Sequence, residues 1–255
     1  SDAQRFIRSL NTSEPLAMIE LDRRQAEYSA MDTELTRWSD TYQAMDDSDN
    51  DPLGQHLGRR RFVANQLRRA WRREEPRRYV TGLFHVYSLA LQLDDINLPP
   101  DSFIASLTGF EHIEHLKISG NAFPDSGDAF LGKFSGLNSL EIDCSLHVLP
   151  QAITVMTQLT HLNLSRNGLV LTDEASARLA NMVGLTHLDL SNNALGNTPD
   201  VSRLNQLTYL NLRNTQISQW PTGTWELPGL LTLHLEDNLI SSIPEQVLTD
   251  TRLAT

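Results

Sequence analysis

A short leucine pattern recurs through most of the chain and constrains what it can fold into more than any other feature. Its clearest copy is LTHLDLSNNAL at residues 185–195. Leu188 and Leu190 alternate with polar residues, which predicts a short strand with its leucines inward and its polar side chains in solvent. Asn193 follows the strand, and its side-chain amide can donate and accept hydrogen bonds, so it can satisfy backbone groups left unpaired at a bend. Each copy therefore predicts a strand followed by a turn.

Seven copies follow one another at intervals of 22–27 residues, beginning at Val86, Ile113, Leu137, Leu159, Leu185, Leu207 and Leu230. The asparagine position is occupied by Asp94, Asn121, Ser145, Asn167, Asn193, Thr215 and Asn238. This pattern, at intervals of about 20–29 residues, is typical of leucine-rich repeats, which stack into a solenoid. We therefore predict an α/β solenoid over residues 83–255, a leucine-rich-repeat horseshoe with a parallel sheet on its concave face. The long return segment at 172–182 should contain a helix.

Residues 1–82 show a helical periodicity instead. After a short helix expected at residues 2–10, apolar residues recur every seven positions in two series up to residue 45: Leu21, Tyr28, Leu35 and Tyr42, and Met31, Trp38 and Met45. A second segment from 53 to 75 repeats this spacing at Leu57, Ala64 and Trp71. Two such seams joined by a short acidic loop predict an antiparallel helical hairpin. Because the first repeat of a solenoid leaves its core open, we expect the hairpin to cap it.

The net charge of −11 is carried by the repeats. Residues 1–82 hold 14 of the 21 Lys and Arg residues and 14 of the 32 Asp and Glu residues, so this part is neutral. An acidic solenoid repels nucleic acid and anionic membranes, and therefore favours a protein partner. The single cysteine, Cys144, excludes an internal disulfide and favours a reducing compartment. Apolar runs are too short to cross a bilayer and the N-terminus is unlike a signal peptide, which indicates a cytosolic type of chain.

The second helix of the hairpin is strongly basic. Nine arginines fall within twenty residues: Arg59, Arg60, Arg61, Arg68, Arg69, Arg72, Arg73, Arg77 and Arg78. They predict either a solvated helix balanced by acidic residues of the preceding helix, or a surface for anionic lipid or nucleic acid. We favour the first interpretation, because the arginines lie on nearly every side of the helix and the segment is neutral.

The outward positions of the predicted strands should stack into columns on the concave face. From these columns and their edge we predict a protein-binding surface of thirteen residues: His115, Lys117, Glu141, His161, Asn163, Arg166, His187, Asp189, Tyr209, Asn211, Arg213, His234 and Glu236. Any repeat protein must expose polar residues, but that does not explain why four of the eight histidines fall here. Tyrosine and arginine are also residues that interfaces use often. Protonation of these histidines near pH 6 is a further hypothesis for tuning binding.

Two chemical alternatives use the same region. His161, His187 and Asp189 can be interpreted as a metal site or an acid–base pair, but no third and fourth ligand is well placed. Cys144 can be interpreted as a nucleophile, but the neighbouring Glu141 and Asp143 would raise its pKa rather than lower it. We therefore expect no catalytic residue, metal or cofactor in this chain.

A helical hairpin followed by short leucine-rich repeats resembles bacterial effectors of the IpaH/SspH type, the novel E3 ligases. The resemblance is carried by residues 21–38, 59–73, 159–167 and 185–193. In that family the repeats select a host substrate and restrain a separate helical domain, whose Cys-x-Asp motif transfers ubiquitin through a cysteine thioester. The resemblance implies that this chain is the substrate-recognition part of such a ligase, delivered from a bacterium into the host cytoplasm.

The chain departs from that family in two ways. Its repeats are longer than the family's ~20 residues, and Cys144 is followed by Ser145 and Leu146, so no catalytic residue can be carried over. An eighth repeat is expected to begin at Leu253, which suggests a fragment of a longer protein. The alternative is a stand-alone leucine-rich-repeat scaffold or receptor-type binder without an enzyme domain.

Overall fold

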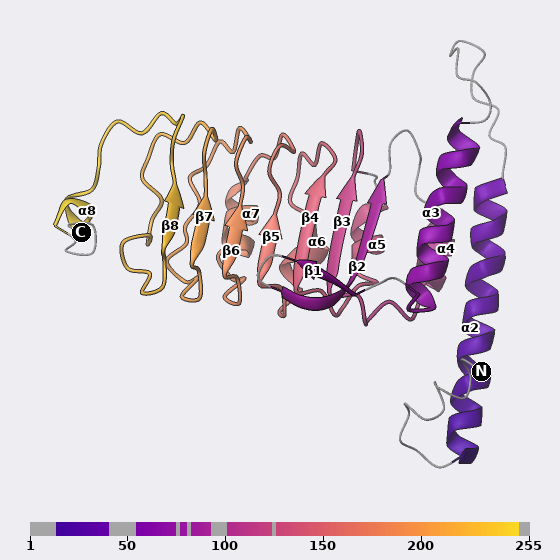
Figure 1. Ribbon diagram of the computed structural model, residues 1–255. Helices are drawn as coiled ribbons and strands as arrows, with labels where there is room; N and C mark the ends of the chain where they lie inside the picture. The colour runs from indigo at the N-terminus through magenta and orange to yellow at the C-terminus, as the bar shows by residue number, and fades with distance from the viewer. Residues whose placement is uncertain are drawn as a thin grey trace, which may run out of the picture.

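The computed structural model describes residues 14–40, 55–74, 77–80, 83–92, 101–123 and 126–249. A helical hairpin stands at one end of an elongated solenoid, and the sheet runs from β1 to β8 in the order of the chain (Figure 1). The helix expected at residues 2–10, the acidic loop at 46–52 and the start of an eighth repeat at Leu253 lie outside the described residues.

The hairpin consists of α2 (Glu14–Asp40) and α3 (Gln55–Trp71), which lie side by side and antiparallel (Figure 1). The predicted seams are its buried faces. Leu35 and Trp38 of α2, and Ala64 and Leu67 of α3, belong to one buried cluster. The same cluster continues into the leucine core of the repeats. The hairpin is therefore joined to the solenoid by apolar packing, as expected of a cap. The seam positions Tyr42, Met45 and Leu57 fall outside the described side chains.

Polar contacts fix the lower end of α3 to the first repeat. The indole Nε1 of Trp71 donates to the carbonyl of Thr108 at 3.0 Å, and the His112 ring donates to the carbonyl of Ala70 at 2.9 Å. Gly109 lies between these contacts with φ +86°, and a Cβ atom there would lie 2.5 Å from the Trp71 Nε1 atom. A glycine is thus required for the indole to approach the chain this closely.

One element was not predicted. The strand β1 (Arg77–Val80) follows α3 and pairs antiparallel with the first part of β2 (Leu83–Gln92), with Arg77 opposite Tyr87. Arg77 and Arg78 therefore belong to a strand and not to the basic helix. Pro76 ends the helical pattern, and the chain after it is too short and too basic for periodicity alone to indicate a strand. The boundary between cap and repeats at residue 82 stays a prediction.

The seven predicted repeats are confirmed strand by strand. The second half of β2 is followed by β3 (His115–Ser119), β4 (Ser139–Asp143), β5 (His161–Asn163), β6 (His187–Asp189), β7 (Tyr209–Asn211) and β8 (Thr232–His234). All seven pair in parallel, and the register places Ser88, His115, Ser139, His161, His187, Tyr209 and Thr232 in one row across the sheet. The outward side chains at equivalent strand positions therefore line up across the sheet, as predicted for the columns of the concave face.

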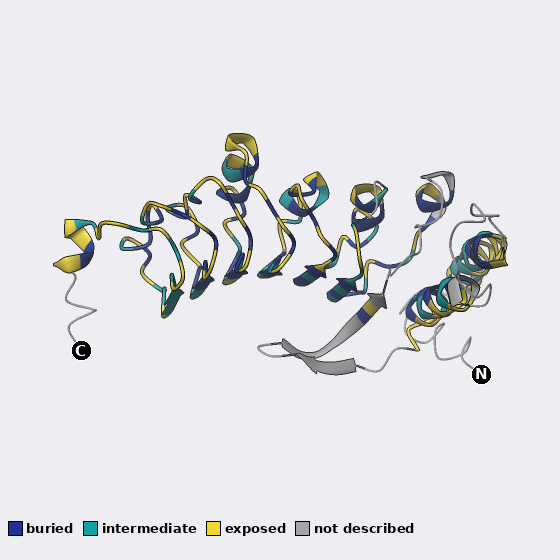
Figure 2. Ribbon diagram, turned by 90° about the horizontal axis from the view of Figure 1, so that it is seen from above, coloured by how far each residue is buried: buried dark blue, intermediate teal, exposed yellow. Residues whose placement is uncertain are grey.

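Short helices form the opposite side of the solenoid (Figure 2). They are α4 (Asp101–Ser106), α5 (Gly127–Leu131), α6 (Gln151–Thr154), α7 (Asp173–Leu179) and α8 (Glu245–Leu248). Of these, only α7 was predicted. The hydroxyl of Thr172 caps it by accepting from the Ala175 N–H. The strands and helices thus enclose the core and leave the strand side open as a concave face.

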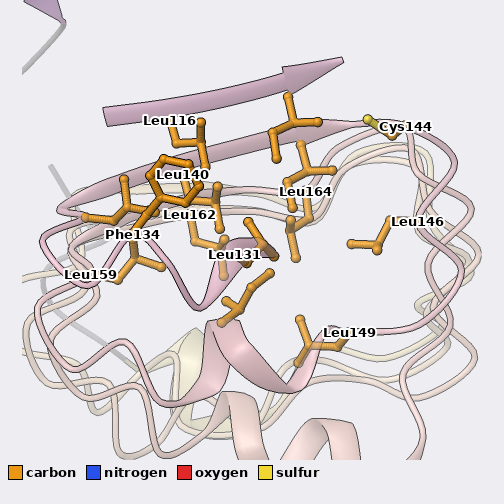
Figure 3. Packing of buried hydrophobic residues seen from close by; sticks show 14 of the residues in the cluster. Leu116, Leu131, Phe134, Leu140, Cys144, Leu146, Leu149, Leu159, Leu162 and Leu164 are labelled. Atoms are coloured by element: carbon orange, nitrogen blue, oxygen red, sulfur yellow. The ribbon is translucent and has the colours of Figure 1, made fainter. Parts of the chain in front are cut away.

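Leucines from successive strands point into the space between the two sides. Leu116, Leu140 and Leu162 occupy equivalent positions on adjacent strands and pack with Phe134 and Leu131 from the return segments (Figure 3). All five are at most 1% exposed. Since inward leucines alternate with outward polar residues, this packing fixes which side chains the concave face presents.

The asparagines after the strands bind the turns together. The Oδ1 atom of Asn193 accepts from the N–H groups of Asn167 and Leu169, both at 2.9 Å. Its Nδ2 atom donates to the carbonyls of Leu164 and Leu190, both at 2.8 Å. The role predicted for this residue is therefore confirmed.

Candidate protein-binding face

Four rings lie against one another across strands β5 to β8. The ring centroids of His161 and His187 are 4.2 Å apart at an interplanar angle of 13°, and those of His187 and Tyr209 are 5.7 Å apart at 19°. Tyr209 meets His234 edge-on at 5.7 Å. Parallel strands in register bring such side chains together because neighbouring strands are about 4.8 Å apart. We call these four residues the aromatic ladder.

Threonines orient the two imidazoles. The hydroxyl of Thr160 donates to the carbonyl of Asn138 at 3.0 Å and lies 2.9 Å from the Nδ1 atom of His161. The hydroxyl of Thr186 likewise donates to the carbonyl of Thr160 at 3.0 Å and lies 3.0 Å from the Nδ1 atom of His187. Because each hydroxyl proton is already donated to a carbonyl, each Nδ1 must carry the proton and donate to the hydroxyl oxygen. In both neutral rings the Nε2 atom is therefore the acceptor.

Burial keeps these rings neutral. It lowers the pKa of His161 from 6.5 to about 4, with smaller contributions from the neighbouring His187 and His115. Burial also lowers the pKa values of His187 and His115, and it raises the pKa of Tyr209. The titration expected near pH 6 is thus moved to lower pH for these three histidines. At neutral pH this part of the ladder is therefore a stack of uncharged rings.

The outward residues two positions further along each strand than the row of His161 and His187 combine ion pairing with turn formation. Lys117 and Glu141 on adjacent strands form an ion pair at 2.5 Å. Further along, the Oδ1 atoms of Asn163, Asp189 and Asn211 each accept from the N–H group two residues ahead, at 3.0, 2.9 and 3.1 Å. These three residues thus end their strands, a structural reason for the polar column that the sequence pattern alone did not reveal.

Asp189 also carries a charge that is not compensated. Its Oδ2 atom accepts from the Nδ2 atom of Asn211 at 3.0 Å. Within the described part of the chain, no lysine or arginine forms an ion pair with it. Its negative charge contributes to the raised pKa of Tyr209. Asp189 thus places a partly buried carboxylate beside the aromatic ladder.

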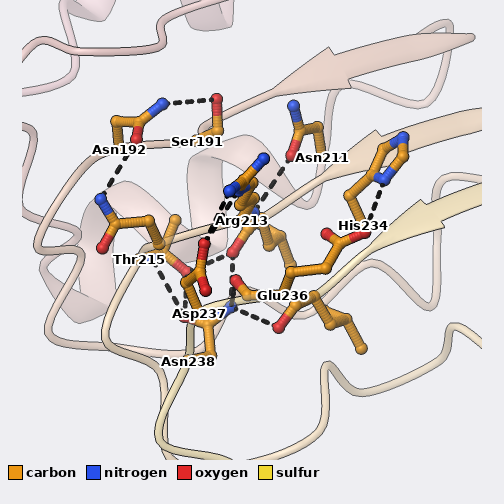
Figure 4. Close-up of polar contacts among 12 residues, drawn as sticks. Ser191, Asn192, Asn211, Arg213, Thr215, His234, Glu236, Asp237 and Asn238 are labelled. Atoms are coloured by element: carbon orange, nitrogen blue, oxygen red, sulfur yellow. Dashed lines mark hydrogen bonds and ion pairs between the residues drawn. The ribbon is translucent and has the colours of Figure 1, made fainter.

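Charged side chains line the edge where the strands end (Figure 4). Arg213 pairs with Asp237 at 2.9 Å, and His234 lies 3.1 Å from Glu236. The hydrogen bond from the His234 side chain helps to lower the pKa of Glu236, after that from the backbone of Glu236 itself. Arg166, exposed after β5 and two repeats before Arg213, adopts φ 61°, which is uncommon for a residue other than glycine. The edge therefore offers both signs of charge to a partner.

The structure places all thirteen predicted residues on the strands or at the edge of the concave face, while their part in binding stays a prediction. His115 stands apart from the ladder because its Nδ1 atom pairs with Ser139 Oγ at 2.8 Å. Sequence reasoning missed Thr160 and Thr186, although the repeated Thr-His pair was the available signal.

The chemical alternatives gain no support from the geometry. His161 and His187 are stacked face to face and do not converge on a shared point. Among the described residues, no group of three or more His, Cys, Asp and Glu is arranged to hold a metal ion. Cys144 is fully buried, so a substrate cannot reach its thiol without local unfolding.

Comparison with known proteins agrees with the repeat assignment. The Leucine Rich Repeat family profile matches residues 184–204. No curated protein sequence matches the chain. A leucine-rich-repeat protein of Leptospira interrogans is similar in structure with a TM-score of 0.42 and 21% identity, covering 63% of this chain and 51% of that one. A structure described as a TDR receptor has a TM-score of 0.40 and 26% identity, covering 56% of this chain and 24% of that one.

The repeat motif and the seven parallel strands define the chain as a leucine-rich-repeat solenoid with a helical cap. Solenoids of this class act as protein-interaction modules, because their stacked strands build an extended concave surface. This chain spans about half of the Leptospira protein and a quarter of the TDR receptor. No helix among the described residues is long and apolar enough to cross a membrane.

Proposed function

We propose that the concave face binds a protein partner, and that the aromatic ladder forms the centre of the contact. The observation that carries this proposal is the stack of His161, His187 and Tyr209, which holds neutral rings in fixed positions beside charged groups. Aromatic residues that are already ordered lose little conformational entropy on binding, and they are enriched among residues that dominate interface energies. Arg166, Arg213 and Glu236 surround them as a polar rim.

The basic helix α3 is better explained as part of the cap. Two of its arginines form ion pairs with the preceding helix, Arg68 with Asp32 at 2.5 Å and Arg61 with Asp40 at 3.0 Å. Arg68 also donates to the hydroxyl of Thr36 at 2.7 Å. These contacts neutralise part of the basic charge within the hairpin. They therefore support a solvent-exposed helix balanced by the acidic residues of α2, and not a surface for lipid or nucleic acid.

Charge reversal on the concave face tests the proposed binding surface. Arg166→Glu, Asp189→Lys and Arg213→Glu are each expected to weaken partner affinity at least tenfold while the circular dichroism spectrum stays unchanged. Exposed ion pairs such as Arg213 with Asp237 contribute little to stability, so folding should survive in the two arginine variants. Asp189→Lys also removes the acceptors of the Ser191 N–H and of Asn211, so its affinity counts only with an unchanged circular dichroism spectrum. The matched control is Arg203→Glu, an exposed arginine in a return segment. Unchanged affinity in all three variants, measured by titration calorimetry with the isolated partner, would remove the concave face from the account.

We further propose that the module belongs to a bacterial ubiquitin-ligase effector that acts in a host cytoplasm and selects the ligase substrate. The hairpin followed by repeats supports this context. The test is ubiquitin transfer by the native full-length protein, beside residues 1–255, with E1, E2 and ubiquitin. A thiol-sensitive ubiquitin adduct on the full-length protein alone is expected. If the folded full-length protein, freed from autoinhibition by bound substrate, formed no adduct, the chain would be a stand-alone scaffold or receptor-type binder.

A further inference from the structure

We propose that Asn167 is a site of spontaneous deamidation, which the stacked repeats suppress for as long as they stay packed. Conversion of this one side chain weakens the link between the repeats that contain β4 and β5, and refolding does not reverse it. The lifetime of the concave face then depends on Asn167, whichever partner that face binds.

Asn167 and Gly168 form the only Asn-Gly pair in the sequence. In such a pair the backbone nitrogen of the glycine can attack the side-chain carbonyl carbon of the asparagine, because no Cβ atom hinders the approach. A bond forms between the Gly168 nitrogen and the Asn167 Cγ atom, the bond from Cγ to Nδ2 breaks, and the Gly168 N–H proton passes through solvent to the ammonia that leaves. Water then opens the five-membered imide, which yields aspartate or isoaspartate at position 167. The only co-reactant is therefore solvent water.

The turn after β5 favours the glycine of this pair. Gly168 adopts φ +66°, and a Cβ atom there would lie 3.2 Å from the Nδ1 atom of His147, so a larger residue fits poorly. Asn193 and Asn238 occupy the equivalent position in later repeats and donate to backbone carbonyls in the same way. They are followed by alanine and leucine, whose side chains hinder the attack. The fold thus provides one reactive pair and two less reactive sites with the same structural role.

The packed structure holds the carboxamide of Asn167 away from this reaction. Its Oδ1 atom accepts from the N–H groups of Cys144 and Leu146, at 3.0 and 3.2 Å. Its Nδ2 atom donates to the carbonyls of Ile142 and Ser165, at 2.6 and 2.9 Å. Three of these four bonds reach the preceding repeat, so the carboxamide is engaged there and not by the backbone that follows it. Asn167 is also only 1% exposed, which keeps out the water that the reaction needs. The repeats must therefore separate before the reaction can proceed.

Conversion disrupts the same network from within. A carboxylate has no hydrogen to donate, so the carbonyls of Ile142 and Ser165 lose their donor and a negative charge is left in a buried place. Isoaspartate also adds a carbon atom to the main chain, which displaces the turn that carries Arg166. The contact between the two repeats and the adjoining edge of the concave face are therefore weakened together.

The test follows conversion in the whole chain over time at mildly alkaline pH, in buffer and in guanidinium chloride, by mass spectrometry of proteolytic fragments. In the denaturant Asn167 should convert first, before Asn193 and Asn238, because only glycine leaves the attack unhindered. In buffer the conversion of Asn167 should be at least about 100-fold slower, since a buried segment is open in only a small fraction of folded molecules. Equal rates in buffer and denaturant, or no lead of Asn167 over the other two in denaturant, would overturn the proposal.

Variants of the stack test the protection directly. Asn193→Ala removes the acceptor of the Asn167 N–H and should speed the conversion of Asn167 in buffer about tenfold, the effect expected when a buried N–H loses its acceptor. Asn205→Ala, at an exposed position, is the matched control and should convert like the native chain. An unchanged rate in Asn193→Ala, with circular dichroism showing a folded protein, would count against the proposal.

The consequence of conversion is tested by Asn167→Asp, which reproduces one product. It should lower the urea concentration at the midpoint of unfolding, whereas Asn205→Asp at an exposed position should leave that midpoint unchanged. An Asn167→Asp protein as resistant to urea as the native chain would show that conversion does not weaken the repeats.

Discussion

Asn193 joins two successive central repeats through its side chain. Its carboxamide makes four short hydrogen bonds to backbone groups of two successive repeats, at 2.8–2.9 Å, and it is 2% exposed. Asn193→Ala leaves the N–H groups of Asn167 and Leu169 buried without an acceptor. Each buried N–H group without an acceptor costs about 1–3 kcal/mol, so the variant should lose about 2–6 kcal/mol of unfolding free energy. That is a large share of the ~5–15 kcal/mol that stabilises a typical domain.

Urea unfolding followed by circular dichroism measures this loss, and amide hydrogen exchange locates it at Asn167 and Leu169. Asn193→Thr should fall between the native protein and Asn193→Ala. Thr215 occupies the same position one repeat later, and its hydroxyl donates to the carbonyl of Leu212 at 2.8 Å. Asn205→Ala, at an exposed position, is the control and should change little. A loss below about 1 kcal/mol, with slow exchange kept at both amides, would refute the reasoning.

Two further changes test the cap and the ladder. Gly109→Ala places a Cβ atom 2.5 Å from the Trp71 Nε1 atom at φ +86° and should destabilise the docked hairpin by about 1–3 kcal/mol. Gly58→Ala, with open space around its Cβ in α3, should leave stability equal or higher, and tryptophan fluorescence during urea unfolding compares the two. Because the folded pKa of His161 is about 4 and its unfolded value is 6.5, the unfolded chain takes up this proton first and stability falls as pH drops below about 6.5. Discounted for the half-exposed ring, the loss from pH 7 to 5 is about 1 kcal/mol. His161→Gln should remove it, and an identical pH dependence in both proteins would contradict the assigned pKa.

The repeats could be predicted from the sequence because their signal is periodic. Leucine at fixed positions specifies which residues face inward, and a one-residue error in register would expose the whole row. The columns containing His161, His187 and Tyr209 followed from that spacing alone. The strand β1 could not be found in this way, since Arg77–Val80 is defined only by its pairing with β2.

The chemical properties of the concave face were harder to predict from the sequence than its position. The tautomers of His161 and His187 depend on which carbonyls accept hydrogen bonds from the hydroxyls of Thr160 and Thr186. These acceptors can be identified only from the three-dimensional structure. The lowered pKa values arise from burial by neighbouring strands, which the composition of a column does not reveal. The same holds for Asp189, which stays without an ion pair because Arg213, two residues past Asn211 on the next strand, pairs with Asp237.

Site-specific photo-crosslinking in the native full-length protein, with its partner, tests the central claim most directly. A photoreactive residue is placed at Asn163 on β5, or at Asn205, an exposed residue in a turn outside the strands. The account predicts a covalent adduct with the partner from position 163 and none from position 205. Crosslinks from position 205 alone would mean that the partner does not bind the concave face.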